Sequence, residues 1–175
     1  MTGLKMVAAA LVFAGGLGAF PAYASQCTPE VTQELTKIGS TRLRVMLFRV
    51  YDAELMTDSG RYPEAEQVAL RLDYLRSIKA DTLVDTTEDE WEKLGYSIGD
   101  NERQWLSELR DMWPDVKSGD CLVAYHENGA GIRFYSADGE LGKIASNAFA
   151  TQFFAIWLDE NSSYRRNRDE LLGER

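Results

Sequence analysis

The sequence has few of the residues on which most enzyme chemistry depends. Its 175 residues include one histidine, His126, and two cysteines. A zinc site built from several histidines is therefore excluded. A serine nucleophile would have to use His126, and no GxSxG turn is present. Because His126 lies beside a predicted hairpin turn, we expect an exposed, solvated side chain, and the sequence identifies no catalytic residue, metal site or cofactor site.

Clusters of basic residues and phosphate-binding loops are also lacking. The chain has 28 acidic and 19 basic residues and a net charge of −9. Nucleic acids and anionic lipid headgroups require clustered Lys and Arg, so this composition disfavours both. The GAG of "ENGAGI" is followed by neither a helix start nor GK[ST], which makes it a turn. The acidic run at residues 85–92 lacks the glycine of a cation-binding loop, and we interpret it as the solvated start of a helix.

Long hydrophobic runs are absent after the N-terminus. Residues 1–24 contain Lys5, an apolar run and the small residues "AYA", which is the layout of a secretory signal peptide cleaved after Ala24. The run is too short and glycine-rich to span a bilayer, which needs about 20 apolar residues. We therefore expect a periplasmic protein whose residues 25–175 form one domain without an integral membrane segment. The sequence leaves its oligomeric state open.

The two cysteines, Cys27 and Cys121, allow a disulfide but do not require one. Disulfides persist in an exported protein, and a bridge here would close a loop of roughly 90 residues and contribute on the order of 4 kcal/mol. The sequence does not show that the two residues meet. Two separate thiols are the alternative.

The hydrophobic periodicity changes twice along the chain. Residues 43–51 alternate well enough for one strand that is apolar on both faces, and residues 68–78 alternate more cleanly. Helical spacing follows at residues 84–94, where Thr87 and Glu90 have the arrangement of a capping box, and at residues 101–113, which end at a proline.

Short strands separated by hairpin turns come next, at residues 120–126, 131–136 and 140–145. Two more helices close the chain, and Ser146 or Asn147 can cap the first of them. Strands and helices are therefore segregated rather than alternating. This order predicts an α+β domain with a mainly antiparallel sheet.

Arginines interrupt the apolar strand positions. Arg42, Arg44 and Arg49 lie in or beside the first predicted strand, and Arg76 follows the second. An arginine on a covered face needs a carboxylate, because an unpaired buried charge is costly. The partner is either an internal acid or the acid group of a ligand. A shift of one residue in strand register exchanges Arg44 for Arg49, so the sequence leaves open which arginine faces inward.

Aromatic residues recur at positions that are predicted to face inward. Core packing is their usual role, but Tyr51, Tyr74 and Trp157 each carry a polar atom that needs a partner when buried. Such atoms near arginines are also typical of an apolar pocket with a few polar anchors. In "QFFAIWLDE", residues 152–160, Trp157 either fills a cleft or lines one. The candidate ligand-binding residues are Arg42, Arg44, Arg49, Tyr51, Tyr74 and Trp157.

Several segments, in their order and spacing, resemble the exported bacterial chalcone isomerase-like proteins. They are IGSTRLRVMLFRVYDAEL, ALRLDYLRSI, WPDVKSGD, IRFYSADGELGKI and FATQFFAIWLDENSSYRRNRDELLG, within residues 38–173. The resemblance implies the chalcone isomerase fold, a large antiparallel sheet with helices against it and a cleft between them. In that superfamily plant enzymes close the flavanone ring of a chalcone, whereas non-catalytic members bind fatty acids, so function does not follow from fold.

The catalytic residues of the plant enzymes carry over only in part. Tyr51 stands at the tyrosine of the family's GVY, and Arg42 or Arg44 at its early arginine. The threonine position is Met46, or Arg44 after a slip in the alignment, and the glycine is Arg49. Methionine cannot donate a hydrogen bond to a ketone, and the loss of such a donor costs roughly a hundredfold in rate. The family's tyrosine and asparagine from the helical part have no counterpart that the sequence identifies.

Three functions are consistent with these observations. The leading hypothesis is a non-catalytic periplasmic protein that binds a small amphipathic ligand, such as a fatty acid, in a cleft between sheet and helices. The first alternative is an isomerase or lyase that acts on a chalcone- or enone-like substrate. The second is an envelope interaction protein without a small ligand, in which Trp157 and Phe153 would fill the cleft.

Overall fold

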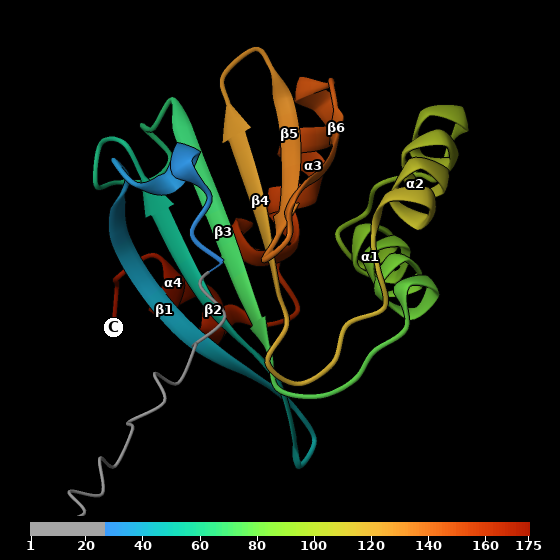
Figure 1. The fold of residues 1–175 in the computed structure, drawn as a ribbon, viewed down its shortest axis with the longest axis horizontal. Helices are drawn as coiled ribbons and strands as arrows, with labels where there is room; N and C mark the ends of the chain where they lie inside the picture. The colour runs from blue at the N-terminus through green and yellow to red at the C-terminus, as the bar shows by residue number, and fades with distance from the viewer. Residues whose placement is uncertain (1–26) are drawn as a thin grey trace, which may run out of the picture.

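An open six-stranded antiparallel sheet forms the centre of the fold (Figure 1). The computed structural model describes residues 27–175, so the predicted signal peptide lies outside the described residues. Every strand pairs only with its neighbours in sequence. The strands are β1 (Thr36–Val45), β2 (Phe48–Thr57), β3 (Gln67–Tyr74), β4 (Cys121–Glu127), β5 (Gly131–Ser136) and β6 (Gly139–Ile144).

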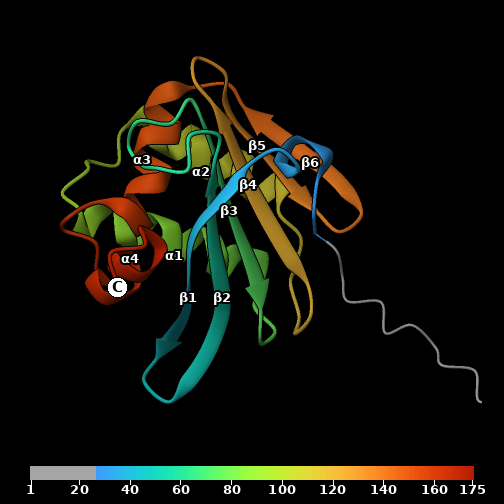
Figure 2. The ribbon, with the colours of Figure 1, turned by 90° about the vertical axis from the view of Figure 1, so that its left-hand side faces the viewer.

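Four helices lie on one side of this sheet (Figure 2), which confirms the predicted α+β class. They are α1 (Ala80–Lys93), α2 (Asp100–Met112), α3 (Asn147–Leu158) and α4 (Arg165–Leu171). A short 3-10 helix, η1 (Glu30–Thr32), lies across the opposite face of the sheet. Within residues 27–175 none of the helices is both long and apolar enough to cross a membrane.

The prediction of one strand over residues 43–51 is wrong, because this segment is a β-hairpin. β1 ends at Val45 and β2 begins at Phe48. Met46, between them, has a positive φ of 55°, a conformation that side chains other than glycine rarely adopt. The pairing of β1 with β2 shifts by one residue between Leu43 and Arg44. The apolar residues of the two strands therefore follow one another in the sequence as if they belonged to a single alternating strand.

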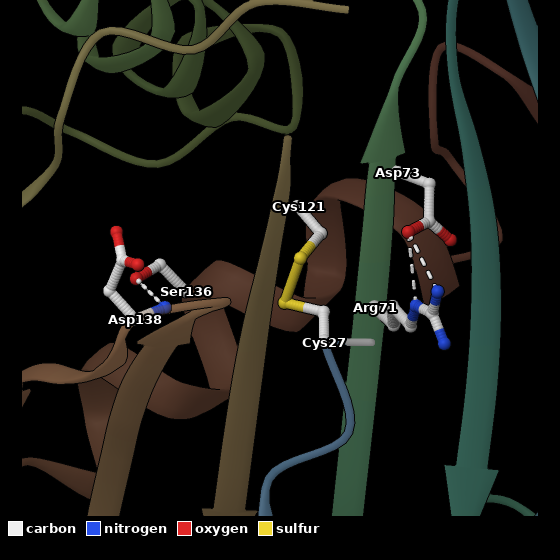
Figure 3. Close-up of a disulfide and its surroundings, with 6 residues drawn as sticks. All are labelled: Cys27, Arg71, Asp73, Cys121, Ser136 and Asp138. Carbon is white, nitrogen blue, oxygen red and sulfur yellow. Dashed lines mark hydrogen bonds and ion pairs between the residues drawn. A yellow bond between two sulfur atoms is a disulfide. The ribbon is translucent and has the colours of Figure 1, made fainter. Parts of the chain in front are cut away.

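The alternation predicted for β3 is confirmed. Leu70, Leu72 and Tyr74 are buried beneath the helices. Arg71 and Asp73 lie on the opposite face, where Arg71 Nη2 donates to Asp73 Oδ1 at 2.9 Å (Figure 3). The sheet therefore has one apolar face toward the helices and a second face with many charged residues.

Helix α1 begins earlier than predicted. It starts at Ala80, whose backbone N–H donates to Asp115 Oδ1 at 2.9 Å. Thr87 lies inside the helix, where its hydroxyl donates to the Leu83 carbonyl at 3.0 Å. The predicted capping box at Thr87 is therefore wrong, and the acidic run at residues 85–92 lies along the middle and end of α1. Gly95, with φ +89°, follows the end of the helix.

The N-terminal segment covers part of the face of the sheet away from the helices. Cys27 and Cys121 form a disulfide that attaches this segment to the start of β4 (Figure 3). Around the disulfide a second, smaller apolar cluster contains Ala69, Val123 and Tyr125. The expectation of a solvated His126 is wrong, since this ring is half-buried with Nδ1 2.8 Å from the Gly131 carbonyl oxygen.

Helix α4 packs against β1 at very short range. A Cβ atom added at Gly39 would lie 2.2 Å from the backbone oxygen of Glu170, so only glycine fits there without a shift of the backbone. Next to it, the Thr41 hydroxyl donates to the Glu170 carboxylate and accepts from Asn167 Nδ2, at 2.6 Å for the second bond. These contacts fix the C-terminal helix on the first strand.

Candidate functional site

A cavity of about 540 Å³ lies between the sheet and the helices α1 and α3. Its sheet wall includes the inward-facing side chains of Leu43, Tyr51, Leu70, Leu72, Leu122 and Phe134. Its helix wall includes Leu83, Thr87, Glu90, Phe153, Ile156 and Trp157. In the sheet register the small Ala124 stands between Leu70 and Phe134, which leaves space that a larger residue would fill. The lining is therefore mainly apolar.

Trp157, Tyr51 and Tyr74 all line this cavity, as the sequence predicts for a pocket. Trp157 Nε1 donates to the Tyr51 hydroxyl at 2.9 Å, and the rings of Tyr51 and Tyr74 meet edge to face at 6.0 Å. The indole N–H is thus satisfied within the wall, and neither Trp157 nor Phe153 fills the cleft. Burial raises the pKa of both tyrosines well above the ordinary value, so their hydroxyls are neutral.

Two buried polar atoms of the lining residues have no partner among the described residues. Glu90 is 3% exposed; its Oε1 accepts from Lys93 Nζ at 2.8 Å, whereas its Oε2 accepts no hydrogen bond. The indole Nε1 of Trp113 is likewise buried without an acceptor. Buried polar groups in native proteins are nearly always paired, so these two atoms are available to a ligand or to water.

The mouth of the cavity is basic. Its exposed residues include Arg76, Ser77 and Lys79, from the connection between β3 and α1. Lys79 Nζ is 2.5 Å from Asp115 Oδ2 and is thereby neutralised. Arg76 lies over the Phe48 ring, 5.1 Å from its centroid, and among residues 27–175 no carboxylate is within 4.0 Å of its guanidinium. The mouth therefore offers an unpaired positive charge.

The three arginines proposed from the sequence do not line the cavity. Arg42 lies on the outer face of β1, where it binds Asp52 through two hydrogen bonds of 2.6 and 2.8 Å. This bidentate contact lowers the pKa of Asp52 below its usual value. Arg44 and Arg49 pair across the hairpin and are exposed near its turn. The structure thus brings Tyr51 and Tyr74 to the cavity without these arginines.

Arg76 is the arginine that the sequence reasoning missed as a binding residue. Arg76 lies two residues after Tyr74 and four after Leu72, whose side chains face the cavity. Extension of the β3 alternation by two residues would therefore have predicted that Arg76 faces the cavity too. Met46, at the position that the resemblance assigns to a catalytic threonine, is 89% exposed at the hairpin turn. It contributes nothing to the cavity.

Comparisons with known proteins agree with this architecture. The model of a family described as chalcone isomerase-like matches residues 33–173. The fold is also similar to the crystal structure of a fatty-acid binding protein from Arabidopsis thaliana, with a TM-score of 0.64 and 10% sequence identity. That similarity covers 81% of this chain and 88% of the plant protein. None of the curated protein sequences matches this chain.

Proposed function

Because the chain belongs to the chalcone isomerase-like family, we propose that it binds a small amphipathic molecule, such as a fatty acid, and does not transform it. The observation that carries this proposal is the mainly apolar cavity of about 540 Å³ with an unpaired guanidinium at its mouth. Ligand pockets for small molecules measure about 300–1,000 Å³ and combine an apolar lining with few polar groups. The plant neighbour, which is named for fatty-acid binding, supports this choice through the shared fold.

The distribution of charge sets the orientation of the ligand. A carboxylate at the inner end would approach the buried Glu90, whose Oε2 is unpaired, and like charges in a desolvated site repel. At the mouth the same carboxylate can accept charge-assisted hydrogen bonds from Arg76. The acyl chain then extends inward along Leu70 and Phe134. A ligand hydroxyl beside either unpaired atom can bind it, because Glu90 Oε2 accepts and the Trp113 indole N–H donates.

Binding without catalysis is favoured over an isomerase or lyase by the placement of the arginines. The plant enzymes that close the chalcone ring use an early-strand arginine, and the neutral phenols and indole N–H of this cavity do not supply its positive charge at the ketone. Arg42, Arg44 and Arg49 all lie outside the cavity, and Arg76 lies at its exposed mouth. A ligand-free interaction protein is disfavoured because the cavity is not filled by Phe153 and Trp157. The periplasmic location remains part of the proposal, on the signal-like residues 1–24.

The decisive experiment compares saturated fatty acids with fatty alcohols of the same chain length, by calorimetric titration of the purified protein. We expect each added methylene to contribute about 0.8 kcal/mol until the cavity is full. Arg76→Gln should weaken acid binding roughly fivefold, a modest effect because the group is exposed, and leave alcohol binding unchanged. Arg42→Gln, on the outer face, is the matched control and should change neither.

Two results would count against the proposal. If neither acids nor alcohols bind, and native mass spectrometry shows only bare protein after purification, the cavity is not a lipid site. If the protein converts chalcones, seen as loss of enone absorbance faster than in buffer, catalysis replaces simple binding.

A further inference from the structure

Four consecutive apolar residues are exposed at the turn between β1 and β2, and we refer to residues 45–48 as the apolar tip. The exposed fractions are 43% for Val45, 89% for Met46, 94% for Leu47 and 60% for Phe48. In the described part of the chain these four are the large hydrophobic residues that are exposed. A contiguous run of this kind marks an interaction surface, since it is unfavourable in water and adds nothing to the core.

The shape of the apolar tip limits what can cover it. In both views the β1–β2 hairpin extends beyond the neighbouring loops at its end of the sheet (Figures 1 and 2). A stable protein–protein interface buries about 1,200–2,000 Å² in total, which four side chains at a narrow, convex turn cannot supply. A protruding apolar turn instead suits insertion into a soft apolar medium.

Basic residues surround the apolar tip. Arg44 and Arg49 face each other across the hairpin directly behind it, and Arg76 lies over Phe48. For none of these three does a carboxylate of residues 27–175 come within 4.0 Å. The whole chain has a net charge of −9, so this concentration of unpaired positive charge is a local exception. Arginines beside exposed apolar side chains complement anionic headgroups above an acyl layer.

We propose that the apolar tip inserts into the surface of an anionic lipid bilayer, with Arg44, Arg49 and Arg76 at the depth of the headgroups. Val45 and Arg76 belong both to this region and to the lining of the cavity, so docking places the cavity mouth against the lipid. A fatty acid can then pass between bilayer and cavity without crossing water. This last step rests on the proposed function, whereas docking does not.

The test is flotation of the full-length protein, without added fatty acid, on vesicles of phosphatidylethanolamine and phosphatidylglycerol. The double variant Met46→Ser/Leu47→Ser should lower the partition coefficient at least roughly tenfold, because two side chains lose their apolar contact. Arg44→Gln and Arg49→Gln should each lower it roughly fivefold, and phosphatidylcholine vesicles should bind the protein more weakly. Arg103→Gln, an exposed arginine of α2, is the matched control. Residues 1–24 are present in every variant, so their contribution cancels.

Equal binding by the parent protein and the serine double variant would overturn the inference, as would equal binding to both kinds of vesicle. A third result would also overturn it: the parent protein is a dimer in sedimentation velocity, the double variant is a monomer, and vesicles capture neither. The apolar tip would then contact a second copy of the chain. If the double variant loses its native circular dichroism, the two arginine variants decide the question. Fatty-acid titration in solution is a separate measurement. If the protein binds vesicles but no fatty acid, the docking inference stands and only the proposed ligand is wrong.

Discussion

Removal of the disulfide should lower stability by several kcal/mol while it leaves the cavity intact. Cys27 and Cys121 are separated by 94 residues, and the chain-entropy relation for a closed loop of that length gives about 4.7 kcal/mol at 25 °C. This figure is an upper value, because a compact denatured state already restricts the loop. The loop includes β1, β2, β3 and both helices α1 and α2, so the bridge restricts most of the cavity wall in the denatured chain.

The measurement is urea unfolding of the Cys27→Ala/Cys121→Ala variant, followed by tryptophan fluorescence. With a slope of about 2 kcal/mol per molar urea, a loss of 3–5 kcal/mol moves the midpoint down by about 1.5–2.5 M. The parent protein with reductant should show the same shift, and the variant should not respond to reductant. Because the disulfide lies on the face away from the helices, the affinity for a cavity ligand should be unchanged. A loss below about 1 kcal/mol would refute the reasoning.

Two further predictions concern stability. Gly39→Ala should destabilise the protein by about 1–3 kcal/mol in urea unfolding, because its Cβ would lie 2.2 Å from the Glu170 carbonyl oxygen. Ser40→Ala, at the neighbouring residue, is the control. Equal stability of the two variants would contradict the close packing of α4 on β1. Stability should also fall as pH rises above about 10, since buried Tyr51 and Tyr74 keep their protons, with a pKa well above the ordinary value, while the unfolded chain releases them. Each tyrosine makes the free energy of unfolding fall by about 1.4 kcal/mol per pH unit in this range. Tyr51→Phe or Tyr74→Phe should each remove one such contribution when urea unfolding is measured at a series of pH values. If the slope does not change, these phenols ionise in the folded protein.

The sequence predicts those parts of the fold that depend on local pattern. The alternation of β3 places Leu70 and Leu72 on the buried face, and Pro114 follows the end of α2 as expected. Both features arise because side-chain direction and backbone restriction act over a few residues. The same local reasoning identifies Tyr51 and Tyr74 as inward-facing.

The errors occur where distant residues or an unusual turn decide the structure. The hairpin turn at Met46 contains no glycine, asparagine or proline, and its apolar side chains imitate a buried strand. The start of α1 is set by Asp115, which comes from the connection after α2 and leaves no signal near Ala80. The hydrophobic pattern does not predict the cavity, because inward-facing apolar residues around Ala124 give the same pattern whether they fill a core or line a cavity.

The paired helices α1 and α2 are attached to the sheet at a narrow stem. The chain leaves after β3 and returns at β4, and at the stem the backbones of Ile78 and Val116 exchange two hydrogen bonds of 2.9 Å. β3 and β4 pair directly with each other, so the helix pair is an insertion between two adjacent strands. On the far side Trp91 Nε1 donates to the Gln152 carbonyl at 3.0 Å, and the rings of Trp91 and Trp105 pack edge to face against Phe149 of α3. The helix pair is therefore fixed at two places, the stem and the aromatic contact with α3, and these two contacts set the position of this wall of the cavity.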